Sequence, residues 1–428
     1  MEEMQTDFRV DRLGEGRYPS PMSGVHFVED AERILFHSRP AQIEALVGKG
    51  QALPSMEAAG PRERLFFEPG NTRCAIVTCG GLCPGINDVI RAIVLCLHYH
   101  YGVSPVVGFR YGYEGLSPRY SHPVLELTPQ AVDRIHQLGG TMLGSSRGPQ
   151  EVPLMVDTLE AMGIQVLFTI GGDGTLRGAH ALAQEIRKRN LHISVIGVPK
   201  TIDNDISFIE RSFGFETAVA QARRVTQSAH TEAVSARNGI GLVRLMGRES
   251  GFIAAYTVLA DNDVNFCLVP EVPFSLEGFL GALEERIKRR GHAVVVAAEG
   301  AGQELMGGLP ERDASGNPKL GDIGLFLRDK IRAHFRERGI RIDLKYLDPS
   351  YSIRSCLANA QDAAFCLLLG HHAVHAAMSG RTDMVVGYWK GHFTHVPIPL
   401  AVSARKRIEP KGHLWESVLA VTGQPRNM

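Results

Sequence analysis

From residue 73 onward, short apolar runs alternate with longer segments whose apolar residues recur at helical spacing. The runs at 73–81 (RCAIVTCGG) and 191–201 (LHISVIGVPKT) have the length and composition of buried strands, and the segments 85–102 and 176–190 have the periodicity of helices. Strands that alternate with helices predict a parallel sheet whose two faces are covered by helices. This alternation restricts the chain to an α/β fold.

A second series of the same kind follows the first. Residues 214–233 are expected to form a helix, and residues 238–247 and 292–300 are expected to form strands. We therefore predict two similar Rossmann-like, three-layer α/β/α lobes, with the active site in the cleft between them. Residues 1–70 are rich in turn residues, with one helical segment near 41–48, and are expected to form an N-terminal extension that packs on the main body or on a neighbouring subunit.

Composition excludes several classes of protein. The chain has 428 residues, of which 44% are apolar and 21% charged, and its net charge is zero, so a nucleic-acid partner is disfavoured. No apolar run is long enough to span a membrane, and the acidic N-terminus does not resemble a signal peptide. Seven cysteines without zinc-type spacing are typical of the reducing cytoplasm.

Two glycine-rich turns each follow a predicted strand and precede a predicted helix. Such a turn lets backbone N–H groups approach an anion, and the helix dipole favours negative charge there. The glycines concerned are Gly80, Gly81 and Gly85, before a helix expected near Ile86, and Gly171, Gly172 and Gly174, before a helix expected near Leu176. Either turn alone could be a structural tight turn, but the pair suggests a phosphate donor and a charged acceptor.

A third strand end carries the charged segment PKTIDND. A carboxylate beside phosphate-binding amides needs a cation, so Asp173 is a candidate for holding Mg²⁺. In PKTIDND, Asp203 or Asp205 could take a proton from an attacking hydroxyl, and Lys200 could neutralise a transferring phosphoryl group. The alternative is a helix start at which the two aspartates cap backbone N–H groups.

The motifs TCGGLCPGINDVIR, GGDGT, PKTIDND, LMGRESGFIA, AAEGAG and DPSYSIR occur in the order found in 6-phosphofructokinases. The resemblance covers residues from about 60 to 410 and is strongest to the ATP-dependent branch of plants and protozoa, which is related to pyrophosphate-dependent enzymes. It implies a glycolytic, Mg²⁺-dependent transfer of the γ-phosphoryl group of ATP to the 1-hydroxyl of D-fructose 6-phosphate, which gives fructose 1,6-bisphosphate and ADP.

The resemblance also implies a role for each motif residue. It assigns the general base to Asp203, with Lys200 and Thr201 as further catalytic residues, and the Mg²⁺ site to Asp173. The implied ATP site comprises Gly81, Arg147, Gly172, Asp173, Gly174, Thr175 and Gly178. The implied fructose 6-phosphate site comprises Thr201, Asp203, Asp205, Met246, Gly247, Arg248, Glu299, Lys345, Tyr351 and Arg354.

The resemblance further predicts the domain limits and the assembly. Residues 71–212 with 353–405 would form the nucleotide-binding lobe, 213–352 the sugar-phosphate lobe, and 406–428 a C-terminal tail. A cytoplasmic homotetramer or homodimer is expected, without a nucleic-acid or membrane partner. Effector-site arginines of bacterial relatives cannot be placed in this chain, so allosteric control stays open.

The phosphoryl donor depends on two positions at which the chain combines features of both branches. Pyrophosphate-using relatives carry an aspartate where this chain has Gly174, and they share the lysine at Lys200. An added carboxylate would exclude the nucleotide, whereas a lysine only adds positive charge, so ATP is the expected donor. The alternatives are a pyrophosphate-dependent enzyme and a catalytically silent regulatory subunit. An NAD or lipid kinase, which could share GGDGT, is disfavoured by PKTIDND.

Overall fold

The computed structural model describes residues 7–307 and 319–428, and these residues form two compact units. Unit 1 contains residues up to Thr201, Ile206–Gly214 and Cys356–Ala404. Unit 2 contains Ile202–Asp205, Phe215–Ser355 and Arg405–Met428. The chain therefore leaves the first unit within the segment PKTIDND.

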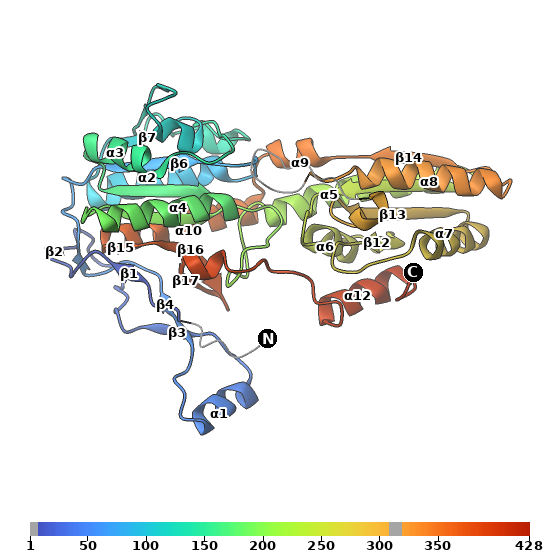
Figure 1. The fold of residues 1–428 in the computed structure, drawn as a ribbon, viewed down its shortest axis with the longest axis horizontal. Coiled ribbons are helices and arrows are strands. Elements are labelled where there is room, and N and C mark those ends of the chain that lie inside the picture. The colour runs from blue at the N-terminus through green and yellow to red at the C-terminus, as the bar shows by residue number, and fades with distance from the viewer. Residues whose placement is uncertain (1–6, 308–318) are drawn as a thin grey trace. The chain divides into compact units, whose positions relative to one another are not determined.

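Unit 1 is built on a nine-stranded mixed sheet (Figure 1), with the order β3-β4-β17-β16-β10-β9-β6-β7-β8. The strands run parallel from β16 through β10, β9 and β6 to β7. Their bounds are Arg33–Leu35 (β3), Ser55–Ala58 (β4), Cys74–Thr78 (β6), Val106–Gly108 (β7), Leu125–Leu127 (β8), Val166–Gly171 (β9), Ser194–Pro199 (β10), Met384–Trp389 (β16) and His392–Pro397 (β17). Four two-residue strands, Asp11–Arg12 (β1), Tyr18–Pro19 (β2), Arg64–Leu65 (β5) and Arg381–Thr382 (β15), pair as β1-β15 and β2-β5.

Helices cover the sheet of unit 1 (Figure 1). One buried apolar cluster joins residues of α3 and α4 to the side chains of Ala75, Leu167 and Val195 on the central strands. Helices α2 and α10 pack against each other, and α10 also contacts β10. The helix bounds are Pro40–Gly48 (α1), Ile86–Tyr101 (α2), Val152–Ala161 (α3), Asp173–Lys188 (α4), Ala360–Met378 (α10) and Ile398–Ala401 (α11).

Unit 2 has a four-stranded parallel sheet in the order β12-β13-β11-β14. Helices α7 and α8 share one apolar cluster with these strands, while α5 and α6 contact each other and the sheet. The bounds are Phe215–Ser235 (α5), Gly239–Leu245 (β11), Phe252–Ala260 (α6), Phe266–Leu268 (β12), Leu276–Arg290 (α7), His292–Ala298 (β13), Ile323–Glu337 (α8), Asp343–Leu347 (β14), Ser350–Ser355 (α9) and His413–Thr422 (α12).

The predicted α/β class is confirmed, and the first glycine turn leads into a helix at Ile86 as expected. Two details differ from the sequence prediction. Helix α4 begins at Asp173, not near Leu176, so Asp173 lies in its first turn. The two sheets are also unequal in size, because short N-terminal strands and the β16–β17 hairpin extend the sheet of unit 1. In the part of the chain that the structure describes, no helix is both long and apolar enough to cross a membrane.

A buried ionic cluster ties the N-terminal residues to the sheet of unit 1. Glu57 on β4 is only 2% exposed and accepts hydrogen bonds from the guanidinium groups of Arg62 and Arg381. Arg381 also donates to Asp30, at 2.6 Å. Because residues 30, 57 and 62 precede the first central strand, the cluster joins the N-terminal segment to β15.

We expect Glu57→Gln to destabilise unit 1 strongly, since it leaves two buried arginines without their main counter-charge. Removing one partner of a buried ion pair typically costs about 3–5 kcal/mol. The exposed pair Arg9–Asp7 provides the control, because Asp7→Asn should cost no more than about 1 kcal/mol. Urea unfolding followed by circular dichroism measures both, and equal small losses would contradict the assigned role of the cluster.

Candidate functional site

Three loops of unit 1 meet at one edge of its sheet. They follow β6, β9 and β10, which are neighbours and run parallel, so the carboxyl ends of these strands lie together. The loop at 141–147 joins them, since Gly80 N donates to Ser146 O at 3.0 Å and Ser145 Oγ donates to Gly80 O at 2.6 Å. The glycine turns and the start of PKTIDND therefore form one cluster.

Lys200, in the loop after β10, reaches the loop after β6, and the loop after β9 lies between them. Its ammonium group donates to Gly81 O at 2.6 Å, and its backbone N donates to Gly171 O at 3.0 Å. The residue is 6% exposed. A buried cation thus lies beside the two glycine turns, where it would favour an anionic ligand.

The N-terminus of α4 presents the second glycine turn. Asp173 lies in its first turn and accepts from Arg177 Nε at 3.0 Å, while Arg177 Nη2 donates to Val402 O at 2.6 Å. Gly174 is exposed, and a Cβ atom built there would meet no atom within 4 Å. There is accordingly room for a ligand group, or for a side chain, at residue 174.

Three other predicted donor-site residues differ in their surroundings. Thr175 is 7% exposed, and its carbonyl accepts from Tyr113 Oη at 2.7 Å. Gly178 faces the same tyrosine, because a Cβ there would lie 2.6 Å from the ring. Its small size is therefore required for packing in this structure. Arg147 is exposed, one residue beyond the loop contact made by Ser146.

The aspartates of PKTIDND do not cap a helix. Residues 201–206 form no helix, and the next helix, α5, begins at Phe215. The capping alternative is therefore wrong. Thr201 O accepts from Ser212 Oγ at 2.7 Å within unit 1, whereas Asp203 and Asp205 belong to unit 2.

Asp203 lies in an electrostatic environment that disfavours its charge. Its Oδ1 atom is buried, and burial is the largest cause that raises the pKa of Asp203 well above the usual carboxyl range. The negative charges of Asp205 and Glu299 raise this pKa further. Arg354 and Arg405 oppose the shift without cancelling it. A carboxylate in such a position accepts a proton readily.

Asp205 is held differently from its neighbour. It is 8% exposed and accepts from Arg405 Nη1 at 2.9 Å, and its carbonyl accepts from Lys406 N at 2.8 Å. Sequence analysis did not find Arg405, because the pair is separated by 200 residues. The ion pair with Arg405 thus holds the side chain of Asp205 in position.

The residues Met246, Gly247 and Arg248, called the MGR turn below, form a second cluster in unit 2 together with Glu299. Glu299 is 9% exposed, and its backbone N donates to Leu245 O at 2.8 Å. Gly300 N donates to Gly247 O, and a Cβ on Gly300 would lie only 1.8 Å from Arg248 O. The close approach of these two turns requires glycine at 300. Met246 is fully buried beside them.

The remaining predicted residues lie at the end of β14 and on α9. The positive charge of Arg354 acts to lower the pKa of Asp203, and the Nε atom of this arginine is buried. Tyr351, in contrast, is 87% exposed. Lys345 is exposed and pairs with Asp343 at 3.1 Å. The structure therefore brings Arg354 toward the acidic cluster and leaves Lys345 on the surface of β14.

Asp173 suits a metal that arrives with a phosphate ligand. Within residues 7–307 and 319–428, no three His, Cys, Asp or Glu side chains gather as a metal site. A single carboxylate at a helix N-terminus would suit Mg²⁺, which is usually held by one or two carboxylates plus phosphate oxygens and water. Such an ion would neutralise charge on the phosphates.

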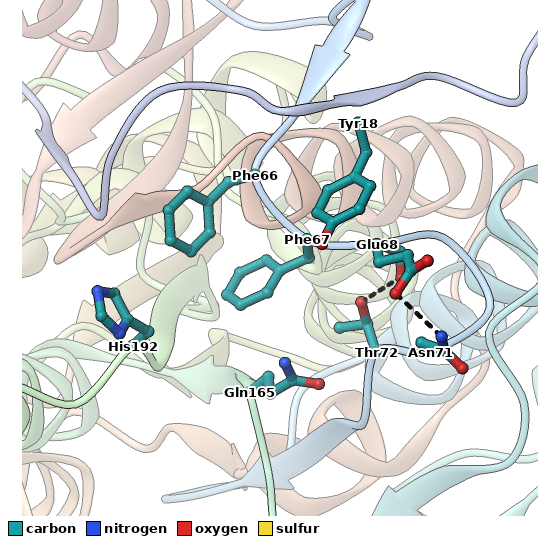
Figure 2. Close-up of a pocket in the computed structure, with 8 residues that line it drawn as sticks. All are labelled: Tyr18, Phe66, Phe67, Glu68, Asn71, Thr72, Gln165 and His192. Carbon is teal, nitrogen blue, oxygen red and sulfur yellow. Dashed lines mark hydrogen bonds between the residues drawn. The ribbon is translucent and has the colours of Figure 1, made fainter.

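A separate hollow lies at the opposite edge of the unit 1 sheet. Figure 2 shows the side chains around this pocket of about 280 Å³, which are Tyr18, Phe66, Phe67, Glu68, Asn71, Thr72, Gln165 and His192. Gln165 and His192 precede β9 and β10, so the pocket lies at the amino ends of these strands. It includes none of the predicted site residues.

Comparison with known proteins agrees with this geometry. The family model described as phosphofructokinase matches residues 73–377. A Borreliella burgdorferi protein named ATP-dependent 6-phosphofructokinase is 48% identical over 99% of this chain and 98% of its own length. The chain belongs to the phosphofructokinase family. The Trypanosoma brucei brucei relative of the same name is 46% identical, with 98% of this chain and 88% of that protein covered.

Solved phosphofructokinase structures share the fold at low sequence identity. A pyrophosphate-dependent phosphofructokinase from Marinobacter aquaeolei has a TM-score of 0.68 and 20% identity, over 83% of this chain and 92% of that one. Phosphofructokinase from Pichia pastoris has a TM-score of 0.63 and 22% identity, over 82% of this chain and 37% of that one. These similarities show the phosphofructokinase fold alone.

The raised pKa of Asp203 makes the stability of the folded state depend on pH. Since folding raises the pKa of this carboxyl, the stability of the folded state falls as pH rises from the unfolded pKa, about 4, toward the folded one. Asp203→Asn removes the ionisation. We expect it to raise the thermal unfolding temperature at pH 8, with a gain that disappears near pH 4.

Asp205→Asn is the matched control for this measurement. It weakens the hydrogen bond from Arg405, so stability should fall by about 1–3 kcal/mol at pH 8. Scanning calorimetry of the two variants measures the contrast. Loss of stability in both variants would contradict the conclusion that the folded state disfavours the charged form of Asp203.

Proposed function

We propose that this chain is an ATP-dependent 6-phosphofructokinase that transfers the γ-phosphoryl group of ATP to the 1-hydroxyl of fructose 6-phosphate. Support comes from relatives of that name that are 48% and 46% identical over nearly the whole chain. The observation that carries the proposal is the pair of clusters joined by PKTIDND. One is a cationic, glycine-lined turn cluster, and the other contains a carboxylate with a raised pKa.

The donor half consists of residues of unit 1. Gly81, Gly172 and Thr175 would contact the phosphates through backbone and hydroxyl groups, and Arg147 would reach them from its exposed loop. Lys200 would balance the charge that develops during transfer. Mg²⁺ held through Asp173 would supply further charge neutralisation when bound. The hydrogen bond from the ammonium group of Lys200 to Gly81 O holds the cation against the first glycine turn.

The acceptor half consists of residues of unit 2. Asp203 would take the proton of the 1-hydroxyl, and its raised pKa makes it a stronger base than an ordinary aspartate. Glu299 would bind sugar hydroxyls and Arg354 would bind the 6-phosphate, which suits its planar, charged fork. The MGR turn would complete the sugar site.

Chain connectivity limits the separation of donor and acceptor groups. Three residues of extended chain span at most about 11 Å, so the Cα atoms of Lys200 and Asp203 cannot be farther apart. Thr201, between them, has its carbonyl fixed by Ser212. The cation and the base of the proposed reaction are thus tied to one short segment.

We also infer a homodimer or homotetramer in the cytoplasm. Tyr351 is assigned to the 6-phosphate but is 87% exposed in the single chain, which suits a site completed by a neighbouring subunit. All seven cysteines are free thiols, which suits a reducing compartment. Light scattering of the purified protein tests the assembly.

A coupled assay with fructose 6-phosphate, Mg²⁺ and either ATP or pyrophosphate tests the proposed function. We expect turnover with ATP, and a decrease of at least about 10²-fold in Asp203→Asn, because general-base catalysis is worth roughly 10²–10⁴-fold. The folded state should persist in this variant. Near-normal turnover in Asp203→Asn would remove the base assignment, and an inactive wild type would favour the regulatory-subunit alternative.

The donor itself is tested at Gly174. The open space at this residue admits a side chain without a clash, so Gly174→Asp should fold and place a carboxylate near the nucleotide phosphates. Repulsion of about 3–5 kcal/mol would lower kcat/KM for ATP by roughly 10²–10⁴-fold. Pyrophosphate should be affected less, because Lys200 remains.

Gly174→Ala is the control, since it adds a methyl group and no charge. The ratio of kcat/KM for ATP and pyrophosphate should change little in this variant and strongly in Gly174→Asp. A wild type that prefers pyrophosphate, or a ratio that is the same in all three proteins, would show that residue 174 does not select the donor.

A further inference from the structure

Arg244 lies on β11, directly before the MGR turn, and was not among the predicted site residues. The parallel register pairs Val243 with Leu347 of β14, so Arg244 lies beside Asp348, the residue that follows β14. On its other side the register pairs it with Ala297 of β13, two residues before Glu299. The strand order therefore places this arginine between two neighbouring strand ends.

The guanidinium group of Arg244 bridges these strand ends. Its Nη1 donates to Asp348 Oδ2 at 2.6 Å, and its Nη2 donates to Glu299 Oε2 at 3.2 Å. Its Nε lies 3.9 Å from Asp322 Oδ1. The side chain is 17% exposed, so these interactions are only partly screened by solvent.

Each of these three carboxylates has a second role in unit 2. Asp348 accepts from both the backbone N and the hydroxyl of Ser350 at the start of α9, at 3.0 and 2.5 Å. Asp322 caps α8 by accepting from Leu325 N at 2.9 Å. The negative charge of Glu299 helps to raise the pKa of Asp203. One cation thus offsets repulsion among three carboxylates, two of which hold the starts of helices α8 and α9.

We propose that Arg244 is a positioning residue that holds Glu299 and helix α9 in the arrangement needed to bind fructose 6-phosphate. The inference rests on the proposed function, because that function assigns Glu299 to the sugar and Arg354 of α9 to its phosphate. The planar guanidinium fork donates to two carboxylates in fixed directions, whereas the donors of a lysine ammonium group rotate. A lysine at 244 would keep the charge and lose one of the two aligned bonds.

Steady-state kinetics with each substrate varied in turn tests the role in binding. Arg244→Met should raise KM for fructose 6-phosphate at least tenfold while KM for ATP stays within twofold. Arg244→Lys should be intermediate. Asp348→Asn should reproduce part of the effect, and adding it to Arg244→Met should cost less than the sum of the two changes.

Arg286→Met is the matched control. Arg286 is a half-buried arginine of the same unit that donates to His292 O at 3.3 Å, away from the candidate site residues. Its replacement should leave both Michaelis constants within twofold of the wild type. An equal rise in KM for fructose 6-phosphate in both variants would reduce Arg244 to a general structural role and overturn the proposal.

Hydrogen exchange of the ligand-free protein provides a readout that does not depend on activity. Peptides that cover residues 348–355 should exchange faster in Arg244→Met and at the wild-type rate in Arg286→Met. Unchanged exchange in this segment, or faster exchange throughout unit 2, would overturn the positioning role. If the wild type does not phosphorylate fructose 6-phosphate, the proposed function fails, but exchange still decides whether Arg244 holds α9.

Discussion

The parallel register of β6, β9 and β10 is the constraint on which the donor half depends. Because these strands are adjacent and run in the same direction, their following loops share one edge of the sheet. Lys200, after β10, can then bond to the backbone of Gly81, after β6, while its own N–H bonds to Gly171. A shift of register by one residue would turn these side chains to the other face and separate the cation from the glycine turns.

Unit 2 uses arginines to give neighbouring carboxylates different chemical properties. Asp205 accepts from Arg405 and Glu299 accepts from Arg244, so each has a directed cationic partner. At Asp203, burial and the negative charges of Asp205 and Glu299 outweigh the positive charges of Arg354 and Arg405, and the pKa rises. Carboxylates within one cluster thus have different surroundings: Asp205 and Glu299 accept hydrogen bonds from arginines, and the pKa of Asp203 is raised.

Sequence patterns predicted the features that depend on neighbouring residues. Buried strands, amphipathic helices and glycine turns have local signatures, and these were predicted from the sequence. The missed features depend on distant residues or on weak patterns. Arg405 meets Asp205 across 200 residues, and Arg244 meets Asp348 across 104 residues, so no local spacing connects them. Strands of two to four residues in the N-terminal segment are too short for a periodic signal. Helix α4 starts earlier than expected because glycine is tolerated in its first turn.

The segment from Lys200 to Asp205 links the cationic glycine-turn cluster of unit 1 to the carboxylate cluster of unit 2 through the covalent chain. Its first part is fixed in unit 1, where Lys200 pairs with Phe213 and Thr201 O accepts from Ser212. Its last part is fixed in unit 2, where the carbonyl of Asp205 accepts from Lys406. Only residues 202–204 lie between these anchors, and Asn204 among them adopts a left-handed conformation with φ of 54°. The side chains of Lys200 and Asp203, to which the proposed function assigns the charge neutralisation and the general base, are therefore attached to one short segment of the chain.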